Sequence, residues 1–220
     1  MDFNLSSPLL SSQFNECLIP LLPEGVSAHL IPLQVSDEFR DDLLMQGVSL
    51  DGLNQKAVLK RQCEYLAGRY CAQQSLLALV QKTDLTLENK EVGTGQNREP
   101  LWPEGILGSI SHSNQFAMAL VAPNNLGYVG FGIDIEECVD ADFAPSLADQ
   151  IMNKAEKACF DQLKEMDFAN FVTLIFSAKE ALFKALFPTV GRYLEFDSSE
   201  LLEVDQTQQC LRFCLTQRLS

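Results

Sequence analysis

Two long stretches of helical periodicity constrain the fold of this chain more than any other feature of its sequence. The first covers residues 57–82, where apolar side chains recur at spacings of three, four and seven. Its apolar positions are Leu59, Cys63, Leu66, Tyr70 and Leu77. Because residues at these spacings share one side of a helix, the pattern predicts an amphipathic helix over 57–82.

The second stretch covers residues 168–187 and predicts another long helix. Its apolar stripe consists of Phe171, Leu174, Ile175, Ala178, Leu182 and Ala185. The opposite side carries a narrow polar strip, which is Thr173, Ser177, Glu180 and Lys184. A solvent-facing helix surface is normally broader and more charged, so the strip is expected to line an enclosed site. The alternative is an ordinary surface ion pair between Glu180 and Lys184.

Between the two helices the pattern changes from helical to extended. Residues 116–122 and 128–135 are predicted to form two strands joined by the turn sequence PNNLG. The preceding residues, 88–115, are rich in Gly, Pro and Asn and predict a long irregular loop. Residues 18–35 suggest short strands broken by Pro and Gly.

The end of the second predicted strand, GFGIDIEE at residues 130–137, places Asp134 and Glu136 two positions apart. Residues i and i+2 of a strand share a face, so the two carboxylates are expected to stand side by side. Like charges that close repel each other unless an opposite charge lies between them. Either both carboxylates reach water where the strand ends, or a cation lies beside them.

Composition limits the classes of partner. The chain has 220 residues, 46% of them hydrophobic and 21% charged, which suits a soluble globular protein of one or two domains. Its net charge of −14 argues against nucleic-acid binding, so an anionic ligand requires a locally basic patch. Seven cysteines without a CxxC pair favour a reducing compartment, and neither a signal peptide nor a membrane span is evident. We therefore expect a cytoplasmic protein without membrane insertion.

A locally basic patch of this kind lies at the start of the first predicted helix. Within positions 56–69, Lys56, Lys60, Arg61 and Arg69 accompany a single acid, Glu64. This basic island is either a solvated helix face or an anion site. Within the same helix, Gly68 costs about 1 kcal/mol relative to alanine, which suggests that a ligand or a crossing chain approaches closely at that point.

Three motifs follow the basic helix in a fixed order: REPLWPEGILGSISHS, GIDIEE and FSAKEALFKALFPTVGRYLEF. Together they resemble a phosphopantetheinyl transferase, and within that superfamily the siderophore type, represented by the enterobactin synthase component that activates carrier proteins. The resemblance runs from about residue 56 to residue 196. It implies transfer of phosphopantetheine from coenzyme A to a serine of an apo carrier protein of siderophore or nonribosomal peptide biosynthesis, with release of adenosine bisphosphate.

The resemblance also implies roles for individual residues. Asp134, Glu136 and Glu180 match the carboxylates that hold Mg²⁺, and Asp134 thereby belongs to the coenzyme A site as well. Lys179 and Lys184 match phosphate-binding lysines, while Ser111 and His112 match residues that contact coenzyme A phosphates. Arg98, Arg61 and Arg69 fall where the family places further cations. Glu180, Lys184 and His112 are the catalytic candidates, with Glu180 taking the serine proton directly or through a metal-bound water.

The fold implied by the resemblance is a pseudo-twofold α+β pair of similar halves, each with a small antiparallel sheet and a long helix, with the active site in the cleft between them. Residues 1–124 would bind the phosphate and adenine end of coenzyme A, and residues 125–220 would carry GIDIE and KEALFK. The protein is expected to be a monomer that docks acidic carrier proteins through apolar contacts. Two other functions stay open at this point: a Mg²⁺-dependent nucleotide phosphohydrolase, and a noncatalytic coenzyme A-binding subunit.

Overall fold

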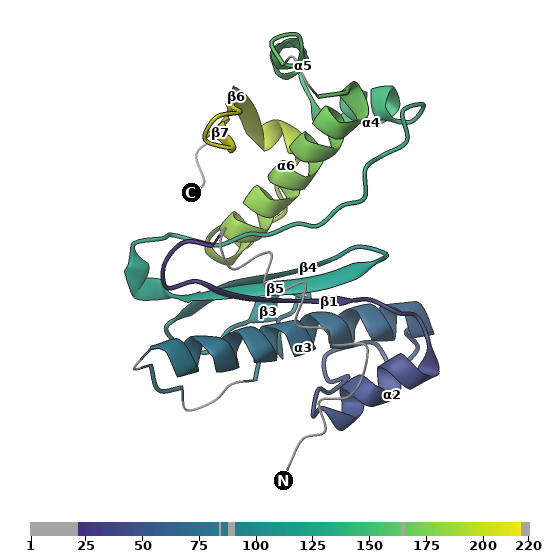
Figure 1. Ribbon diagram of the computed structural model, residues 1–220, viewed down its shortest axis with the longest axis vertical. Coiled ribbons are helices and arrows are strands. Elements are labelled where there is room, and N and C mark those ends of the chain that lie inside the picture. Colours follow the sequence, from purple (N-terminus) through teal and green to yellow (C-terminus); the bar gives the residue numbers. More distant parts are fainter. Residues whose placement is uncertain (1–21, 84, 88–90, 164–165, 217–220) are drawn as a thin grey trace. The chain divides into compact units, whose positions relative to one another are not determined.

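The computed structural model describes residues 22–83, 85–87, 91–163 and 166–216. The chain is α+β and falls into two compact units, which divide between Ile135 and Glu136 (Figure 1). Each unit has a small antiparallel sheet and one long helix. The N-terminal part of the predicted strand region, residues 18–21, lies outside the described residues.

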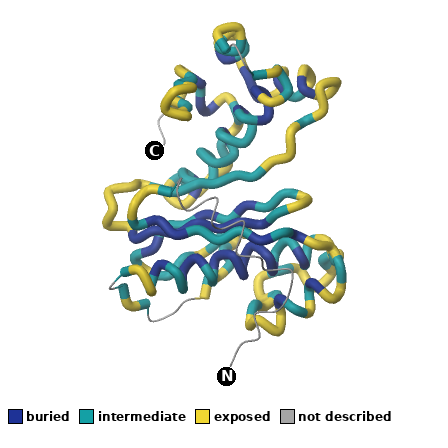
Figure 2. Tube along the Cα trace, viewed as in Figure 1, coloured by how far each residue is buried: buried dark blue, intermediate teal, exposed yellow. Residues whose placement is uncertain are grey.

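A three-stranded antiparallel sheet with the order β1-β5-β4 forms the centre of the first unit. Two helices and a two-stranded sheet accompany it. The elements of this unit are β1 (Ser27–Pro32), α2 (Asp37–Met45), α3 (Leu59–Lys82), β2 (Gly93–Thr94), β3 (Pro100–Leu101), β4 (Ile106–His112) and β5 (Phe116–Pro123). Figure 2 shows the buried residues gathered on this sheet and on α3. The predicted helix over 57–82 is therefore confirmed, as is the strand over 116–122.

The central strand β5 is buried on both faces, and its residues pack in three apolar clusters. Ala117 and Ala119 pack in the cluster that contains α3, whereas Leu120 and Ala122 pack in another with Phe131. Small residues toward α3 let the helix approach closely, so that the Ser75 hydroxyl donates to the carbonyl of Ala119 at 3.0 Å.

Close approach also explains Gly68. A Cβ atom at this position would lie 2.7 Å from Cγ2 of Ile110 on β4. The crossing strand β4 therefore approaches α3 closely at this glycine. The apolar stripe predicted for α3 is largely correct, because Cys63, Leu66 and Tyr70 are buried, although Leu77 is only half-buried.

The structure differs from the sequence analysis on residues 88–115, which were expected to be an irregular loop. They contain the hairpin of β2 and β3 and the seven-residue strand β4. The small residues of β4, which are glycine and serine, made this segment look like a loop. The packing of the strand requires them. At Gly108, for example, a Cβ atom would lie 2.7 Å from the Trp102 ring.

The strand predicted over residues 128–135 is wrong. The structure assigns no strand there, although PNNLG does form a turn, with a 3-10 helix at Asn124–Leu126 followed by the left-handed Gly127. The amides of Ile133 and Ile135 donate to side-chain hydroxyls of β4 instead of to backbone carbonyls. A hydrogen-bonded ladder is therefore replaced by side-chain contacts. This segment packs within the first unit, before the division between the units.

The second unit consists of three helices and a hairpin: α4 (Ala144–Ile151), α5 (Lys154–Phe160), α6 (Phe168–Val190), β6 (Ser199–Asp205) and β7 (Cys210–Leu215). Its core joins Phe171 and Ile175 of α6 to Ile151 of α4 and Leu201 of β6. The helix predicted over 168–187 is confirmed and continues to Val190, with Pro188 in its last turn. Asp167 caps its first turn by accepting the amide of Asn170 at 2.8 Å.

Candidate functional site

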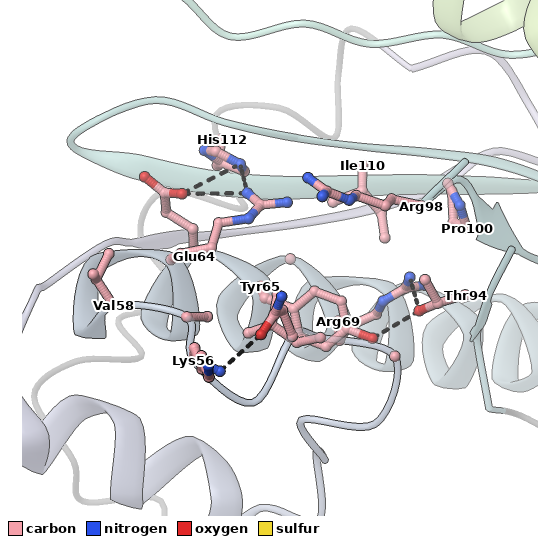
Figure 3. A pocket seen from close by; sticks show the side chains of 16 residues that line it. Lys56, Val58, Glu64, Tyr65, Arg69, Thr94, Arg98, Pro100, Ile110 and His112 are labelled. Atoms are coloured by element: carbon pink, nitrogen blue, oxygen red, sulfur yellow. Dashed lines mark hydrogen bonds and ion pairs between the residues drawn. The ribbon is translucent and has the colours of Figure 1, made fainter. Parts of the chain in front are cut away.

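A cavity of about 440 Å³ lies in the first unit between α3, β4 and the β2–β3 hairpin. Figure 3 shows side chains of α3 and of β4 pointing toward one another across it. Its charged and hydrogen-bonding lining includes Lys56, Arg61, Glu64, Tyr65, Arg69, Thr94, Arg98 and His112. Five of these eight side chains carry a positive charge or acquire one on protonation, in a chain whose net charge is −14. The cavity is therefore suited to an anion.

At one end of the cavity Arg61 and His112 are in direct contact. Nη1 of Arg61 lies 3.1 Å from Nε2 of His112 and 3.3 Å from Oε2 of Glu64. A guanidinium group only donates hydrogen bonds, so Nε2 of His112 accepts and the ring proton lies on Nδ1. His112 is thus a neutral imidazole in this arrangement, held next to a permanent cation.

Arg69 forms the middle of the cavity wall and is only 8% exposed. Its Nη2 donates to Oγ1 of Thr94 at 2.8 Å, and its guanidinium lies 5.1 Å from the centre of the Tyr65 ring. Burial lowers the pKa of Arg69, yet an arginine remains protonated at neutral pH. Its Nη1 is buried without a hydrogen-bond partner among the described residues, which is unusual for a charged donor.

Arg98 reaches the cavity from the turn between β2 and β3. Its φ of 67° lies in the left-handed region, which a residue other than glycine adopts only at a cost. Two backbone hydrogen bonds close the turn, from Gly95 to the Glu99 carbonyl at 2.8 Å and from Arg98 to the Gly95 carbonyl at 3.0 Å. An arginine is therefore held at a position that favours glycine.

Ser111 and Asp134 do not line this cavity. Neighbouring residues of a strand point to opposite faces, so Ser111 lies on the face of the sheet opposite to His112. Its hydroxyl donates to Oδ1 of Asp134 at 2.9 Å, and its side chain is buried. The hydroxyl of Ser111 is therefore engaged by the carboxylate of Asp134.

Lys179, which the sequence analysis assigned to phosphate binding, is buried in the second unit. Its ammonium group lies 2.7 Å from Oε1 of Glu156 and donates to the carbonyls of Ile151 and Phe196 at 2.7 and 3.0 Å. An ammonium group has three protons, and these three acceptors engage all of them. Lys179 therefore serves the packing of the second unit in this structure.

Both parts of the chain match models of one enzyme family. Residues 50–122 match the 4'-phosphopantetheinyl transferase N-terminal domain, and residues 130–220 match the 4'-phosphopantetheinyl transferase superfamily. Enterobactin synthase component D of Salmonella typhi is 31% identical over 90% of this chain and 76% of that protein. The 4'-phosphopantetheinyl transferase Npt of Nocardia iowensis is 30% identical over 82% of this chain and 74% of that protein.

This chain belongs to the 4'-phosphopantetheinyl transferase superfamily. It is accordingly an enzyme that transfers phosphopantetheine to carrier proteins. A further relative, the 4'-phosphopantetheinyl transferase PptT of Mycobacterium tuberculosis, is 33% identical over 72% of this chain and 66% of that protein.

Of the residues that the sequence analysis assigned to this transferase's site, the structure brings four together around one cavity: Arg61, Arg69, Arg98 and His112. The expected metal ligands are divided, with Asp134 in the first unit and Glu136 and Glu180 in the second. Within the described ranges of each unit, no three His, Cys, Asp or Glu side chains gather as a metal site. Glu180 and Lys184 are half-buried on α6, and Glu136 is exposed.

The polar strip expected on α6 of the transferase includes one residue with a different role. Thr173 is buried; its hydroxyl donates to the carbonyl of Ala169 at 2.8 Å and accepts the amide of Val139 at 3.0 Å. It therefore fixes the chain that leads into the second unit. Ser177, Glu180 and Lys184 remain half-buried.

The sequence analysis missed two residues of the cavity wall and the buried partner of Lys179. Tyr65 and Thr94 share a hydrogen bond at 2.8 Å at the wall of the cavity, and Glu156 is the buried partner of Lys179. Glu156 had a recognisable signal, because Asn153 and Glu156 form a capping box at the start of α5. Thr94 had none, since it reaches the cavity only through the fold of the hairpin.

None of the transferase's helices in the described part of the chain has the length and apolar character needed to span a bilayer. The six cysteines in the described part of the chain are free thiols.

Proposed function

We propose that this transferase moves the phosphopantetheine group of coenzyme A to a serine of apo carrier proteins that act in siderophore or nonribosomal peptide biosynthesis, in a Mg²⁺-dependent reaction. The observation that carries the proposal is the cavity on α3, which gathers arginines and a histidine in an acidic protein. The name of the Salmonella relative supports the siderophore context.

The cavity is proposed to hold the phosphorylated ribose and adenine end of coenzyme A. Arg61, Arg69 and Arg98 supply permanent positive charge, and arginine suits phosphate because its planar group donates two parallel hydrogen bonds. Nη1 of Arg61 lies 3.1 Å from Nε2 of His112. Because a guanidinium group has five N–H donors, a phosphate can bind to the others while this contact persists.

Asp134, Glu136 and Glu180 are proposed to hold Mg²⁺, because carboxylate oxygens are the hard ligands that this ion prefers. The ion supplies positive charge that stabilises the pyrophosphate as its bond breaks. The donor set fits, since one oxygen of Asp134 is already fixed by the Ser111 hydroxyl. Lys184 is proposed to bind phosphate beside it. Lys179, whose protons are all engaged, is proposed to hold α6 in place for its neighbour Glu180.

In the proposed reaction the carrier serine oxygen attacks the phosphorus that bears pantetheine. A new P–O bond forms to serine, the P–O bond within the pyrophosphate breaks, and adenosine 3',5'-bisphosphate leaves. Glu180 accepts the serine proton, which makes it the base. Lys184 and His112 stabilise the negative charge that develops on the phosphate oxygens.

The two units are proposed to be the similar halves of a pseudo-twofold pair, with coenzyme A between them. Their shared composition supports this, since each has a long helix and an antiparallel sheet, α3 with β1-β5-β4 and α6 with β6-β7. The boundary near residues 124 and 125 and the division of roles between 1–124 and 125–220 stay predictions. So do the monomeric state and the cytoplasmic location, which the free thiols support.

The test is a mass measurement on apo carrier proteins from siderophore pathways, incubated with the enzyme, coenzyme A and Mg²⁺. We expect the carrier to gain one phosphopantetheine mass and EDTA to abolish the gain. Consumption of coenzyme A without a change in the carrier would indicate a phosphohydrolase. Binding of coenzyme A without either change would indicate a noncatalytic subunit.

A further inference from the structure

The segment that carries Asp134 is attached to β4 by serine side chains. Oγ of Ser109 accepts the amide of Ile133 at 3.1 Å, and Oγ of Ser111 accepts the amide of Ile135 at 3.2 Å. The two serines lie two residues apart on one face of β4, and the two amides have the same spacing. Both serines are almost fully buried, at 3% and 4% exposed. The serines thus replace the ladder that another strand would form.

The two serines differ in one contact. The hydroxyl of Ser111 also donates its proton to Oδ1 of Asp134 at 2.9 Å. A hydroxyl has one proton to give and lone pairs to accept with, so Ser111 holds the backbone and the carboxylate of one segment at the same time. Ser109 makes the matching backbone contact to Ile133, whose side chain has no polar group.

From these contacts we infer that Ser111 is a positioning residue for the Asp134 carboxylate, and that its hydroxyl fixes the orientation in which Asp134 meets the cation. The inference rests on the proposed function, in which Asp134 is a metal ligand. The physical reason is that a carboxylate already fixed by a buried hydrogen bond loses less side-chain freedom when it binds. A backbone ladder would hold the segment equally well but would leave the carboxylate unoriented.

The test uses Mn²⁺ as a probe of the cation site, with the electron paramagnetic resonance signal of free Mn²⁺ measured in the presence of saturating coenzyme A. For Ser111→Ala, we expect the Mn²⁺ dissociation constant to rise about tenfold, as is common when a group that orients a metal ligand is removed. Ser109→Ala is the matched control, because it also leaves one buried amide without its acceptor. Ser111→Ala should melt somewhat lower than Ser109→Ala, because it also loses the hydrogen bond to Asp134. Ser109→Ala should leave the Mn²⁺ dissociation constant within about twofold of wild type.

A double-mutant cycle then tests whether Ser111 acts through Asp134. In an Asp134→Asn background, Ser111→Ala should change the Mn²⁺ dissociation constant far less than it does in wild type. Ser111→Cys, which is nearly isosteric and keeps only a weak donor and acceptor, should also weaken Mn²⁺ binding, and it remains informative if the alanine variant does not fold.

Two outcomes overturn the inference in different ways. If Ser109→Ala and Ser111→Ala raise the Mn²⁺ dissociation constant equally, Ser111 only attaches the segment, and the proposed function stands. If Asp134→Asn alone leaves Mn²⁺ binding unchanged, Asp134 is not a ligand, and the metal site of the proposed function fails together with the inference.

Discussion

Single residues of the cavity on α3 have roles that their neighbours in sequence do not share. Arg61 lines the cavity, whereas the side chain of Lys60 lies outside it and donates to Oδ1 of Asn114 at 2.9 Å. The basic island of the sequence is therefore partly an anion site and partly a solvated face. Such differences make matched variants possible, because two cations of equal charge can be removed one residue apart.

Replacing Arg61 by alanine is expected to weaken coenzyme A binding by tenfold or more, since a hydrogen bond to a charged group contributes about 1.5–3 kcal/mol. The affinity of the variant for dephospho-coenzyme A, which lacks the ribose phosphate, should fall much less. Calorimetric titration with both ligands measures the difference. Lys60→Ala is the control for net charge and should affect neither ligand strongly. If Arg61→Ala lost the same affinity for both ligands, Arg61 would not contact the ribose phosphate and would be part of the solvated helix face.

Arg98 combines a functional side chain with a strained backbone. Because its φ of 67° favours glycine, Arg98→Gly is expected to raise the free energy of unfolding by about 1 kcal/mol. The same change should weaken coenzyme A binding, since it removes a cavity cation. Arg98→Ala should weaken binding equally without the gain in stability. Urea unfolding and ligand titration of both variants test this, and equal stabilities for glycine and alanine would contradict it.

At the scale of elements, the packing of α3 against the sheet decides the charge state of a histidine on β1. The His29 ring lies 5.9 Å from the Tyr70 ring of α3, and burial lowers the pKa of His29 to about 4. In the unfolded chain this pKa is about 6.5. As the pH falls from about 6.5 to 4, the unfolded chain binds a proton that the folded protein does not, so the folded state loses stability.

Wild type is therefore expected to lose on the order of 1–2 kcal/mol more stability than His29→Phe between pH 7 and pH 4.5. Phenylalanine keeps an aromatic ring next to Tyr70 but does not titrate. Urea unfolding at several pH values measures the difference, in which the carboxylates common to both proteins cancel. If both proteins lost the same stability as the pH falls, the packing of α3 against β1 would not be the cause of a lowered His29 pKa.

For the whole molecule, charge sets how the enzyme meets its partner. The net charge of −14 opposes long-range attraction to an acidic carrier protein, while the basic cavity is the proposed binding site of coenzyme A. At saturating coenzyme A, the rate of carrier modification at low carrier concentration should therefore rise severalfold as NaCl increases from about 0.02 to 0.2 M, because salt screens repulsion. The apparent affinity for coenzyme A should fall over the same range. A carrier rate that falls with salt would instead indicate a basic docking surface.

The amino-acid sequence by itself determined the features that depend on local patterning. Helical periodicity located α3 and α6, an apolar run located β5, and the basic island of the first helix contains Arg61 and Arg69, which line one cavity. These features follow from residues within a few positions of one another, where the spacing of apolar and charged side chains is sufficient evidence.

Only the tertiary structure decided what depends on distant segments. The residues of β4 look like a loop because Gly108 accommodates Trp102 and because its serines bond to residues 133 and 135. The segment with residues 133 and 135 needs no strand partner, because the serines of β4 accept its amides. Lys179 is engaged by Glu156 for a similar reason, because the packing of α5 against β6 brings a carboxylate far away in sequence to the ammonium group. A buried polar group must be satisfied by whichever partner the fold brings near, and local sequence does not contain that information.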